Sequence, residues 1–306
     1  MKMAAPGGSS GFCPFCEGNE DATPPEILAF RKGEGKPNST GWLVRAIPNK
    51  FSAFELEGKL EEKQVGIYRF CNGLGKHEVI IETPHHGTEL HELEPEQVEM
   101  IISTFKQRYN DLARDERIKY IQIYKNRGLF GGASLEHSHS QIVAFPFDPG
   151  ENAGLPQYYK EKGSCLICDI LEQERNAGQR LIYEGEHFVV LCPYASRFAN
   201  EAWIVPKRHT EHFGDLTEAE EKELARLAKK LSRAIVDALD NPSYNFMINT
   251  APVNSGNQPG YHWYMEFTPR LLVAAGVEVA TGIYINPMSP EIAAPVLREG
   301  WQAQKT

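Results

Sequence analysis

The chain carries the same series of motifs twice, and this repeat constrains its fold more than any other feature. Each half opens with a Cys-x-x-Cys pair, "CPFC" at Cys13 and Cys16 and "CLIC" at Cys165 and Cys168. After each pair come an extended segment, a helix-like pattern and two strand-like segments. With 306 residues the chain is long enough for two domains. A duplicated unit is the better account of this order.

Histidines recur in the same register in both halves. His86 and His137 are 51 positions apart, and His209 and His262 are 53 positions apart. The two intervals agree across a helix and two strands, which is hard to credit to chance. The histidines therefore belong to the duplicated unit and are candidates for a role that both halves share.

The repeat predicts an α+β fold of two tandem domains from internal duplication, residues 1–150 and 151–306, each an antiparallel sheet with packed helices. A segment rich in glycine, proline and charge, residues 148–163, is expected to link them. The clearest helix spans residues 216–239, where Thr217 opens a capping box and leucines follow at helical spacing. The other expected elements are a helix at 93–114, an extended segment at 77–87, and strands within 119–126, 188–213, 243–252 and 261–269.

The cysteine pairs and the histidines together predict two metal sites. In a reducing compartment such pairs are metal or redox sites more often than disulfides. Two thiolates supply half of a tetrahedral zinc site, and two imidazoles complete it as a closed structural site. The predicted ligand sets are Cys13, Cys16, His86 and His137 in the first half, and Cys165, Cys168, His209 and His262 in the second.

Other cysteines and histidines receive different interpretations. Cys71 and Cys192 lie among apolar residues and are expected to be small core residues. His85, His91 and His212 are expected at the surface, although His85 and His212 are rival ligands to their neighbours. The sequence leaves that choice of ligand open.

The segment "GGASLEHSHSQIVAFP" (131–146) places His137, His139 and Gln141 two residues apart. On a strand such residues share one face, so both histidines could bind one metal. The second half has His262 where the first has His137, but it has tyrosine and glutamate where the first has His139 and Gln141. The metal ligand is thus shared by the halves, and we expect His139 to be free for chemistry.

A free imidazole beside a glycine-rich turn is suited to nucleophilic attack on phosphorus, because the phosphoimidazolium formed can be discharged by a second acceptor. Such a transfer needs donors for the charge on the phosphoryl oxygens. Gln141 offers an amide NH₂ group, and Ser134 offers a hydroxyl. The turn also offers backbone N–H groups. The turn residues expected to contact substrate are Gly132, Ala133 and Leu135.

Composition limits the partners. The net charge of −9 argues against nucleic-acid polymers, which are bound through a basic surface. No apolar run approaches the roughly 18 residues of a membrane span. The start, "MKMAAPGGSSGF", lacks a signal-peptide pattern and is interpreted as a loose tail. We expect a cytoplasmic protein without a membrane partner.

"CPFC", "TPHH", "GGASLEHSHSQ" and "IVPKRH" resemble the galactose-1-phosphate uridylyltransferases, in the His-x-His-x-Gln branch of the histidine-triad superfamily. "IVPKRH", "YNFMINTAP" and "TGIYINP" look closest to the sub-branch that includes plant ADP-glucose phosphorylase. The resemblance implies two histidine-triad-like domains, the second with a degenerate catalytic motif. It also implies a ping-pong nucleotidyltransferase that acts on a nucleotide sugar through a nucleotidyl-histidine at His139.

The resemblance assigns further residues. Gln141 and Ser134 would hold the phosphoryl group, Asn49 would contact the ribose or base, and Asn126 the phosphates. A loop would complete the sugar site of a partner subunit, which implies a homodimer. The residues of this chain that match this loop are Gly276, Glu278 and Val279.

The chain also departs from the better-known uridylyltransferases. Their motif is His-Pro-His, whereas this chain has Ser138 in place of the proline. The second half has Cys165 and Cys168 where many relatives use a carboxylate and histidines for iron or zinc. These differences leave the catalytic step unchanged, and they leave open both uridine and adenosine as the nucleoside and both galactose 1-phosphate and another acceptor.

The leading hypothesis is a UDP-glucose:hexose-1-phosphate uridylyltransferase. The alternative is a phosphorylase of ADP-glucose or of a dinucleoside polyphosphate, with inorganic phosphate as acceptor. A zinc-stabilised nucleotide-binding module without turnover is a third reading. A histidine-triad hydrolase is disfavoured, because that branch has a third histidine where Gln141 stands.

Overall fold

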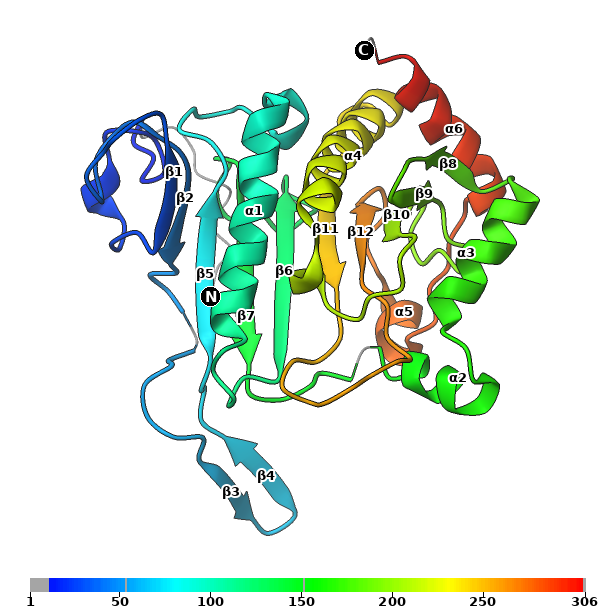
Figure 1. Cartoon of the computed structure of the whole chain (residues 1–306), viewed down its shortest axis with the longest axis horizontal. Helices are drawn as coiled ribbons and strands as arrows, with labels where there is room; N and C mark the ends of the chain where they lie inside the picture. The colour runs from blue at the N-terminus through cyan, green and yellow to red at the C-terminus, as the bar shows by residue number, and fades with distance from the viewer. Residues whose placement is uncertain (1–10, 53, 151, 305–306) are drawn as a thin grey trace.

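Ten strands form one continuous antiparallel sheet in the computed structural model, which describes residues 11–52, 54–150 and 152–304 (Figure 1). The tail expected at the start of the chain falls almost entirely on residues 1–10, outside the described residues. From one edge of the sheet to the other, the strands are β1 (Leu28–Arg31), β2 (Trp42–Pro48), β5 (Lys76–Ile81), β7 (His139–Phe145), β6 (Tyr120–Arg127), β11 (Tyr244–Asn249), β12 (Tyr264–Pro269), β10 (Ala202–Pro206), β9 (Phe188–Leu191) and β8 (Leu181–Glu184).

The two halves of the chain meet at the middle of this sheet. Strand β6 of the first half pairs antiparallel with β11 of the second, with Asn126 opposite Asn245 and Tyr124 opposite Met247. The predicted α+β fold and tandem arrangement are confirmed, and the sheets of the two halves prove to be joined edge to edge. Because edge strands present unpaired N–H and C=O groups, this pairing satisfies an edge of each half.

Helices cover one face of the sheet across both halves. Figure 1 shows α1 and α4 lying side by side over the central strands, with α6 beyond them. The largest core cluster lies between these helices and the strands. The helices are α1 (Pro95–Leu112), α2 (Gly154–Lys162), α3 (Leu166–Ala177), α4 (Glu218–Ala238), α5 (Gly276–Thr281) and α6 (Pro290–Gln302), with short 3₁₀ turns η1 (Glu20–Ala22), η2 (Leu90–Glu92) and η3 (Phe213–Asp215).

The opposite face carries two smaller clusters, one in each half. In the first half, Phe15 from the cysteine turn packs on Trp42, Val79 and Ile81. In the second half, residues of α2 and α3 pack on β9, β10 and β12. The strand residues of these clusters alternate with those of the largest cluster, as Val189 and Leu191 do with Phe188 and Val190, so they lie on the other face of the sheet. The cysteine pair of each half thus reaches the same face of the sheet.

Most expected elements occur where the sequence placed them. The capping box of α4 is present, with the Glu220 N–H donating to Thr217 Oγ1 at 3.3 Å and the Thr217 N–H donating to Glu220 Oε2 at 2.8 Å. The linker differs, because residues 154–162 form α2. This helix has Pro156 in its first turn, where proline is tolerated, and Gly163 ends it with a φ of 73°.

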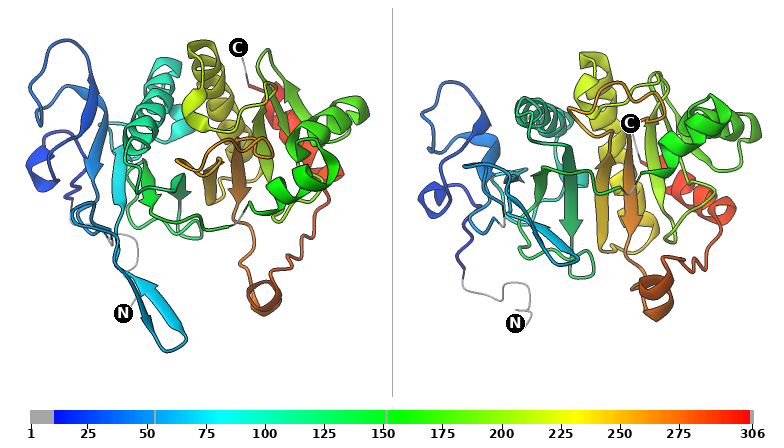
Figure 2. Two further views of the ribbon diagram at one scale, coloured as in Figure 1. Left: turned by 60° about the horizontal axis from the view of Figure 1, so that its bottom comes forward. Right: turned by 90° about the horizontal axis from the view of Figure 1, so that it is seen from below.

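A hairpin of β3 (Glu62–Val65) and β4 (Tyr68–Cys71) projects from the body of the protein (Figures 1 and 2). All eight of its strand residues are exposed. Cys71 is therefore exposed, and the expectation that it is a core residue is wrong. Cys192 is fully buried, as expected. None of the described helices combines the length and apolar character needed to cross a membrane.

A buried ion pair fixes α1 to the sheet. The Arg108 guanidinium of α1 donates to both carboxylate oxygens of Glu78 in β5, at 2.7 and 2.8 Å. The Glu78 side chain has no solvent exposure. Because a bidentate pair of this kind satisfies a buried carboxylate, removing the arginine would leave an uncompensated charge.

We predict that Arg108→Met lowers the free energy of unfolding by about 3–5 kcal/mol, because Glu78 stays buried without its partner. Arg114→Met is the matched control, since Arg114 is exposed and lies 3.6 Å from Asp111. The control should change stability by less than about 1 kcal/mol. Urea unfolding of both variants checks this, and equal stabilities would contradict the role given to the pair.

Candidate active site and metal centres

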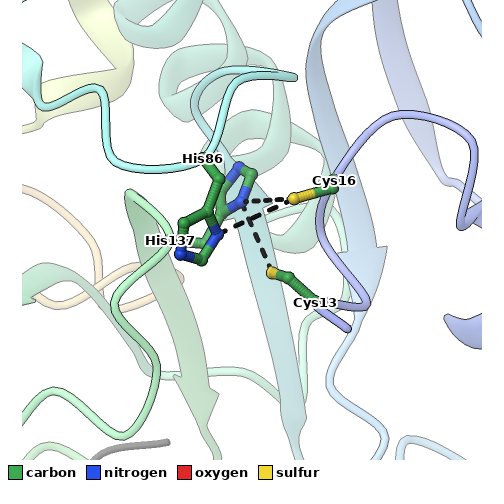
Figure 3. Close-up of side chains that lie close together, drawn as sticks. All are labelled: Cys13, Cys16, His86 and His137. Atoms are coloured by element: carbon green, nitrogen blue, oxygen red, sulfur yellow. Dashed lines mark hydrogen bonds between the residues drawn. The ribbon is translucent and has the colours of Figure 1, made fainter. Parts of the chain in front are cut away.

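Four predicted ligands of the first half converge on one point. Figure 3 shows the side chains of Cys13, Cys16, His86 and His137 directed at one another. Their ligand atoms lie within 4.8 Å of one another. The Nδ1 atom of His137 is 3.5 Å from the Cys13 sulfur and 3.7 Å from the Cys16 sulfur. The edges of a tetrahedral zinc site with two sulfurs and two nitrogens are about 3.3–3.8 Å, so these residues fit such an ion.

The outer hydrogen bond of His137 determines which ring nitrogen faces the cluster. His137 Nε2 donates to the carbonyl oxygen of Thr83 at 2.7 Å, which leaves Nδ1 unprotonated. Burial lowers the pKa of His137 to about 4, so the ring is neutral at pH 7. Burial and the neighbouring Cys13 sulfur raise the pKa of Cys16 to about 11, so a cation is needed to hold that sulfur as thiolate.

The second half repeats this geometry. Cys165, Cys168, His209 and His262 also have their ligand atoms within 4.8 Å of one another. The Cys168 sulfur lies 3.4 Å from Nδ1 of both histidines. His262 Nε2 donates to the carbonyl oxygen of Pro206 at 2.9 Å, and Pro206 precedes His209 by the three positions that separate Thr83 from His86. Ligands and outer hydrogen bonds are therefore duplicated together.

The structure also places the rival histidines. His86 and His209, rather than His85 and His212, join the clusters. His85 is exposed and His212 is half-buried. His91 is buried, with 8% exposure, so its expected surface position is wrong. Packing of η2 against α4 covers it.

His139 lies outside the first cluster although it is two residues from His137. Its Nδ1 donates to the carbonyl oxygen of His137 at 2.7 Å, because a carbonyl can only accept. The hydrogen bond leaves the Nε2 lone pair of His139 available. Burial lowers the pKa of His139, which keeps the imidazole neutral and nucleophilic.

A cavity of about 300 Å³ lies beside His139. His139 and His137 line it together with Asn126, Ala133 and Leu135 of the strand and turn that precede them. The ring of Phe15 packs edge-on against the His139 ring, with centroids 5.4 Å apart. Phe15 stands between Cys13 and Cys16, so the cysteine turn helps to hold the His139 ring in place.

Gln141 is held by a network that the sequence did not reveal. Its Oε1 accepts from His77 Nε2 at 2.8 Å and from the Tyr124 hydroxyl at 3.1 Å. Asn49 Nδ2 lies 3.3 Å from His77 Nδ1 and extends the network. With its oxygen occupied twice, Gln141 turns its NH₂ group away from both donors. The amide is thus oriented as a donor, as a phosphoryl oxygen requires.

The glycine-rich turn is held partly by its own backbone. The Gly132 N–H donates to Leu129 O at 3.0 Å and the Ala133 N–H donates to Gly128 O at 3.1 Å, so these two groups close the turn. Ser134 is exposed. The Nδ2 atom of Asn126 lies 4.0 Å from where a Cβ on Gly132 would stand, so the turn and Asn126 are close neighbours.

A buried charge pair lies behind the histidine strand. Lys125 Nζ donates to Glu82 Oε2 at 2.7 Å, to Ser138 Oγ at 2.8 Å and to the carbonyl oxygen of His139 at 3.3 Å. Ser138 and Ser140 both donate to Glu82. Burial would raise the pKa of Glu82, but the Lys125 ammonium and the two hydroxyls lower it below its usual value. Ser138 thus belongs to a buried polar network.

The second half has different chemistry at the positions of His139 and Gln141. Tyr264 packs on Trp203 with ring centroids 4.3 Å apart. Glu266 accepts from Arg197 at 2.7 Å and from Asn249 at 3.0 Å. Both side chains are buried, and the Glu266 carboxylate has its partners within the protein, so the second half has the Cys–His cluster without an imidazole at the position of His139.

The 276–279 segment lies apart from His139 within this chain. It forms α5, at the lower edge of the second half in Figure 1. Glu278 lines a separate cavity of about 240 Å³ with Arg197 and Tyr284. The Gly276, Glu278 and Val279 group is therefore not brought to the histidine strand in this chain.

Sequence reasoning missed His77, Tyr124, Lys125 and Glu82. The alternation of strands gives a partial signal for His77 and Tyr124, because polar residues on one face of a strand within an apolar sheet need partners. Nothing local to Lys125 or Glu82 indicates that they meet, since their strands are brought together only by the fold.

Comparison with known families gives two adjoining matches. The model described as galactose-1-phosphate uridyl transferase, N-terminal domain, matches residues 38–149, and the corresponding C-terminal domain matches residues 151–285. The ADP-glucose phosphorylase of Arabidopsis thaliana is 37% identical over 295 residues, 94% of this chain and 81% of that protein. A galactose-1-phosphate uridylyltransferase of Thermotoga maritima is 36% identical over 249 residues, 78% of each chain.

Solved structures agree with these matches. A structure of the Arabidopsis thaliana ADP-glucose phosphorylase with bound ADP-glucose has a TM-score of 0.81 and 34% identity, and covers 95% of this chain and 92% of that one. A uridylyltransferase structure has a TM-score of 0.82 and 26% identity, and covers 98% of this chain and 94% of that one.

The two clusters predict two thiophilic metal ions per chain. Cys13→Ser should retain only one and should lower the temperature of unfolding, because metal binding is coupled to folding. The exposed Cys71→Ser is the matched control and should keep both ions. Elemental analysis of purified protein checks this. A Cys13→Ser protein with two ions, or a wild-type protein with one, would contradict the duplicated site.

Proposed function

The chain belongs to the galactose-1-phosphate uridyl transferase family and is an enzyme of that family, and from this premise we propose that it transfers a nucleotidyl group from a nucleotide sugar through a covalent intermediate on His139. The observation that carries the proposal is the hydrogen bond from His139 Nδ1 to His137 O, which leaves Nε2 as a neutral nucleophile beside a cavity. The leading substrate pair is UDP-glucose and a hexose 1-phosphate.

The reaction has two steps of displacement at phosphorus. In the first, His139 Nε2 attacks the α-phosphorus, an N–P bond forms, and the bond to the sugar 1-phosphate oxygen breaks. In the second, a phosphate oxygen of the acceptor attacks the same phosphorus and the N–P bond breaks. The NH₂ groups of Gln141 and Asn126 and the Ser134 hydroxyl would stabilise the charge on the phosphoryl oxygens.

A phosphorylase is the second candidate, with ADP-glucose as donor and inorganic phosphate as acceptor. The similarity to the Arabidopsis thaliana ADP-glucose phosphorylase extends over 94% of this chain, whereas that to the Thermotoga maritima uridylyltransferase extends over 78%. The first displacement is the same in both reactions. The candidates differ in the base of the donor and in the acceptor.

We propose zinc for both metal clusters, because two thiolates and two imidazoles form the donor set that zinc prefers in closed structural sites. The metal would hold Cys13, Cys16, His86 and His137 together and take no part in the displacement. Residues 1–150 would form the catalytic half, and residues 151–306 the half with a degenerate motif. A nucleic-acid polymer is not among the proposed partners.

We propose that the active enzyme is a cytoplasmic homodimer. Exposed apolar side chains around α5, including Val273, Val279 and Ile285, give this segment a surface suited to a partner chain. Gly276, Glu278 and Val279 would then complete the sugar site of the other subunit. No disulfide joins any of the six cysteines, all of which lie within the described residues, and this supports a reducing compartment.

Intact mass spectrometry tests the intermediate. After incubation with UDP-glucose or ADP-glucose without acceptor, the protein should gain one nucleoside monophosphate, and the base gained identifies the donor. His139→Ala should lose this adduct. His85→Ala is the matched control, since His85 is exposed and outside the cluster, and should keep it. An adduct that persists in His139→Ala would contradict the proposal.

The acceptor is tested on the isolated adduct. Galactose 1-phosphate should discharge it to the nucleotide sugar if the protein is a uridylyltransferase, and inorganic phosphate should discharge it to the nucleoside diphosphate if it is a phosphorylase. Failure of all nucleotide donors to form an adduct would favour a binding module without turnover.

A further inference from the structure

Asn245, a residue of the second half, contacts the proposed phosphate site of the first half. Strand β11 pairs with β6 so that Asn245 lies directly opposite Asn126. Asn245 Nδ2 donates to Asn126 Oδ1 at 2.8 Å and to the carbonyl oxygen of Gly131 at 2.7 Å. A side chain of one half thus bridges the strand and the glycine-rich turn that flank the histidine motif of the other.

These two bonds determine how the Asn126 amide is oriented. The Gly131 carbonyl can only accept, so the group of Asn245 that faces it must be the NH₂ group. The second N–H of the same group points at Asn126, which must then present its oxygen. The NH₂ group of Asn126 is left on the opposite side, close to Gly132. Asn126 is therefore held as a donor toward the turn.

Residues at and just before the start of β11 also contact the glycine-rich turn and the end of β6. The Phe130 N–H donates to Ser243 Oγ at 3.3 Å, and Arg127 donates to the Pro242 carbonyl at 2.7 Å. A Cβ on Gly131 would stand 2.9 Å from the Tyr244 carbonyl oxygen, so the turn lies directly against the start of β11. The second half therefore packs directly against the turn. Within this contact, Asn245 is the residue that hydrogen-bonds to the Asn126 side chain.

We propose that Asn245 is a positioning residue for nucleotidyl transfer, acting through Asn126, and that the second half completes the catalytic site of the first. The bond to Gly131 anchors the Asn245 amide, and the bond to Asn126 fixes the direction of the Asn126 NH₂ group. The inference rests on the proposed function, because it matters only if Asn126 contacts the phosphates. It gives the second half, which lacks a nucleophile, a part in the reaction.

The chain offers a matched control on the same strand. Asn249 is four residues from Asn245 and shares its face of β11, but its Nδ2 donates to Glu266 in β12. Replacing either residue with alanine removes an amide from the same strand and face. Only Asn245→Ala removes the hydrogen bond to the Asn126 side chain.

The test is single-turnover formation of the nucleotidyl adduct in the metal-loaded full chain, with the donor that gives an adduct in the wild-type protein. Asn245→Ala should slow adduct formation at saturating donor by about 10- to 100-fold, with a smaller change in the donor concentration that gives half the maximal rate. Asn249→Ala should change the rate by less than about threefold. Asn245→Asp should be slower than Asn245→Ala, because the carboxylate would draw the NH₂ group of Asn126 toward itself.

A double variant separates positioning from a general effect on folding. If Asn245 acts through Asn126, Asn126→Ala/Asn245→Ala should match Asn126→Ala within about threefold, and the two effects should not multiply. Thermal unfolding of all variants shows whether they are folded at the assay temperature. Rate losses that multiply in the double variant, or equal rates of adduct formation for Asn245→Ala and Asn249→Ala, would overturn the inference. Neither result would contradict the proposed function. A wild-type protein that forms no adduct with any nucleotide donor would overturn both.

Discussion

The hydrogen bond from His139 to the backbone carbonyl of His137 is the interaction on which the site depends. It joins the Cys–His cluster to the proposed nucleophile, because His137, whose side chain belongs to the cluster, supplies the carbonyl that orients the His139 imidazole. The same bond places the proton of His139 on Nδ1 and leaves Nε2 free to attack. Phe15, held between the two cysteines, packs on the same ring. A metal that takes no part in chemistry would therefore still control the direction of the nucleophile.

The side-chain amides of Gln141 and Asn126, which we propose contact the phosphoryl group, are oriented in the same way. The oxygen of Gln141 is occupied by His77 and Tyr124, and the oxygen of Asn126 is occupied by Asn245. In each amide the NH₂ group points away from the residues that bind the oxygen. In the proposed transfer, donors that are already oriented would need little reorganisation when negative charge develops on the phosphoryl oxygens. If Gln141 and Asn126 contact the phosphoryl group as proposed, their two NH₂ groups would form part of an anion site that is already oriented before substrate binds.

The sequence predicted the duplicated parts of this arrangement better than the unique ones. The eight residues of the two Cys–His clusters could be predicted because the spacing in one half could be checked against the other, and that comparison singled out His139. The pairing of β6 with β11 could not be found, since contacts between distant strands leave no local pattern. Asn245 and His77 went unnoticed for the same reason, because the partners of each lie on other strands that are distant in the sequence. Cys71 was misjudged because apolar neighbours in an exposed hairpin resemble those of a core strand.

A crystal structure of the protein with a nucleotide sugar would distinguish the roles proposed for the two histidines. Anomalous scattering would locate the metal, and electron density would locate the phosphorus. We expect an ion bound by Cys13, Cys16, His86 and Nδ1 of His137, with phosphorus bonded to Nε2 of His139. An ion bound by both His137 and His139, or phosphorus bonded to His137, would contradict these roles.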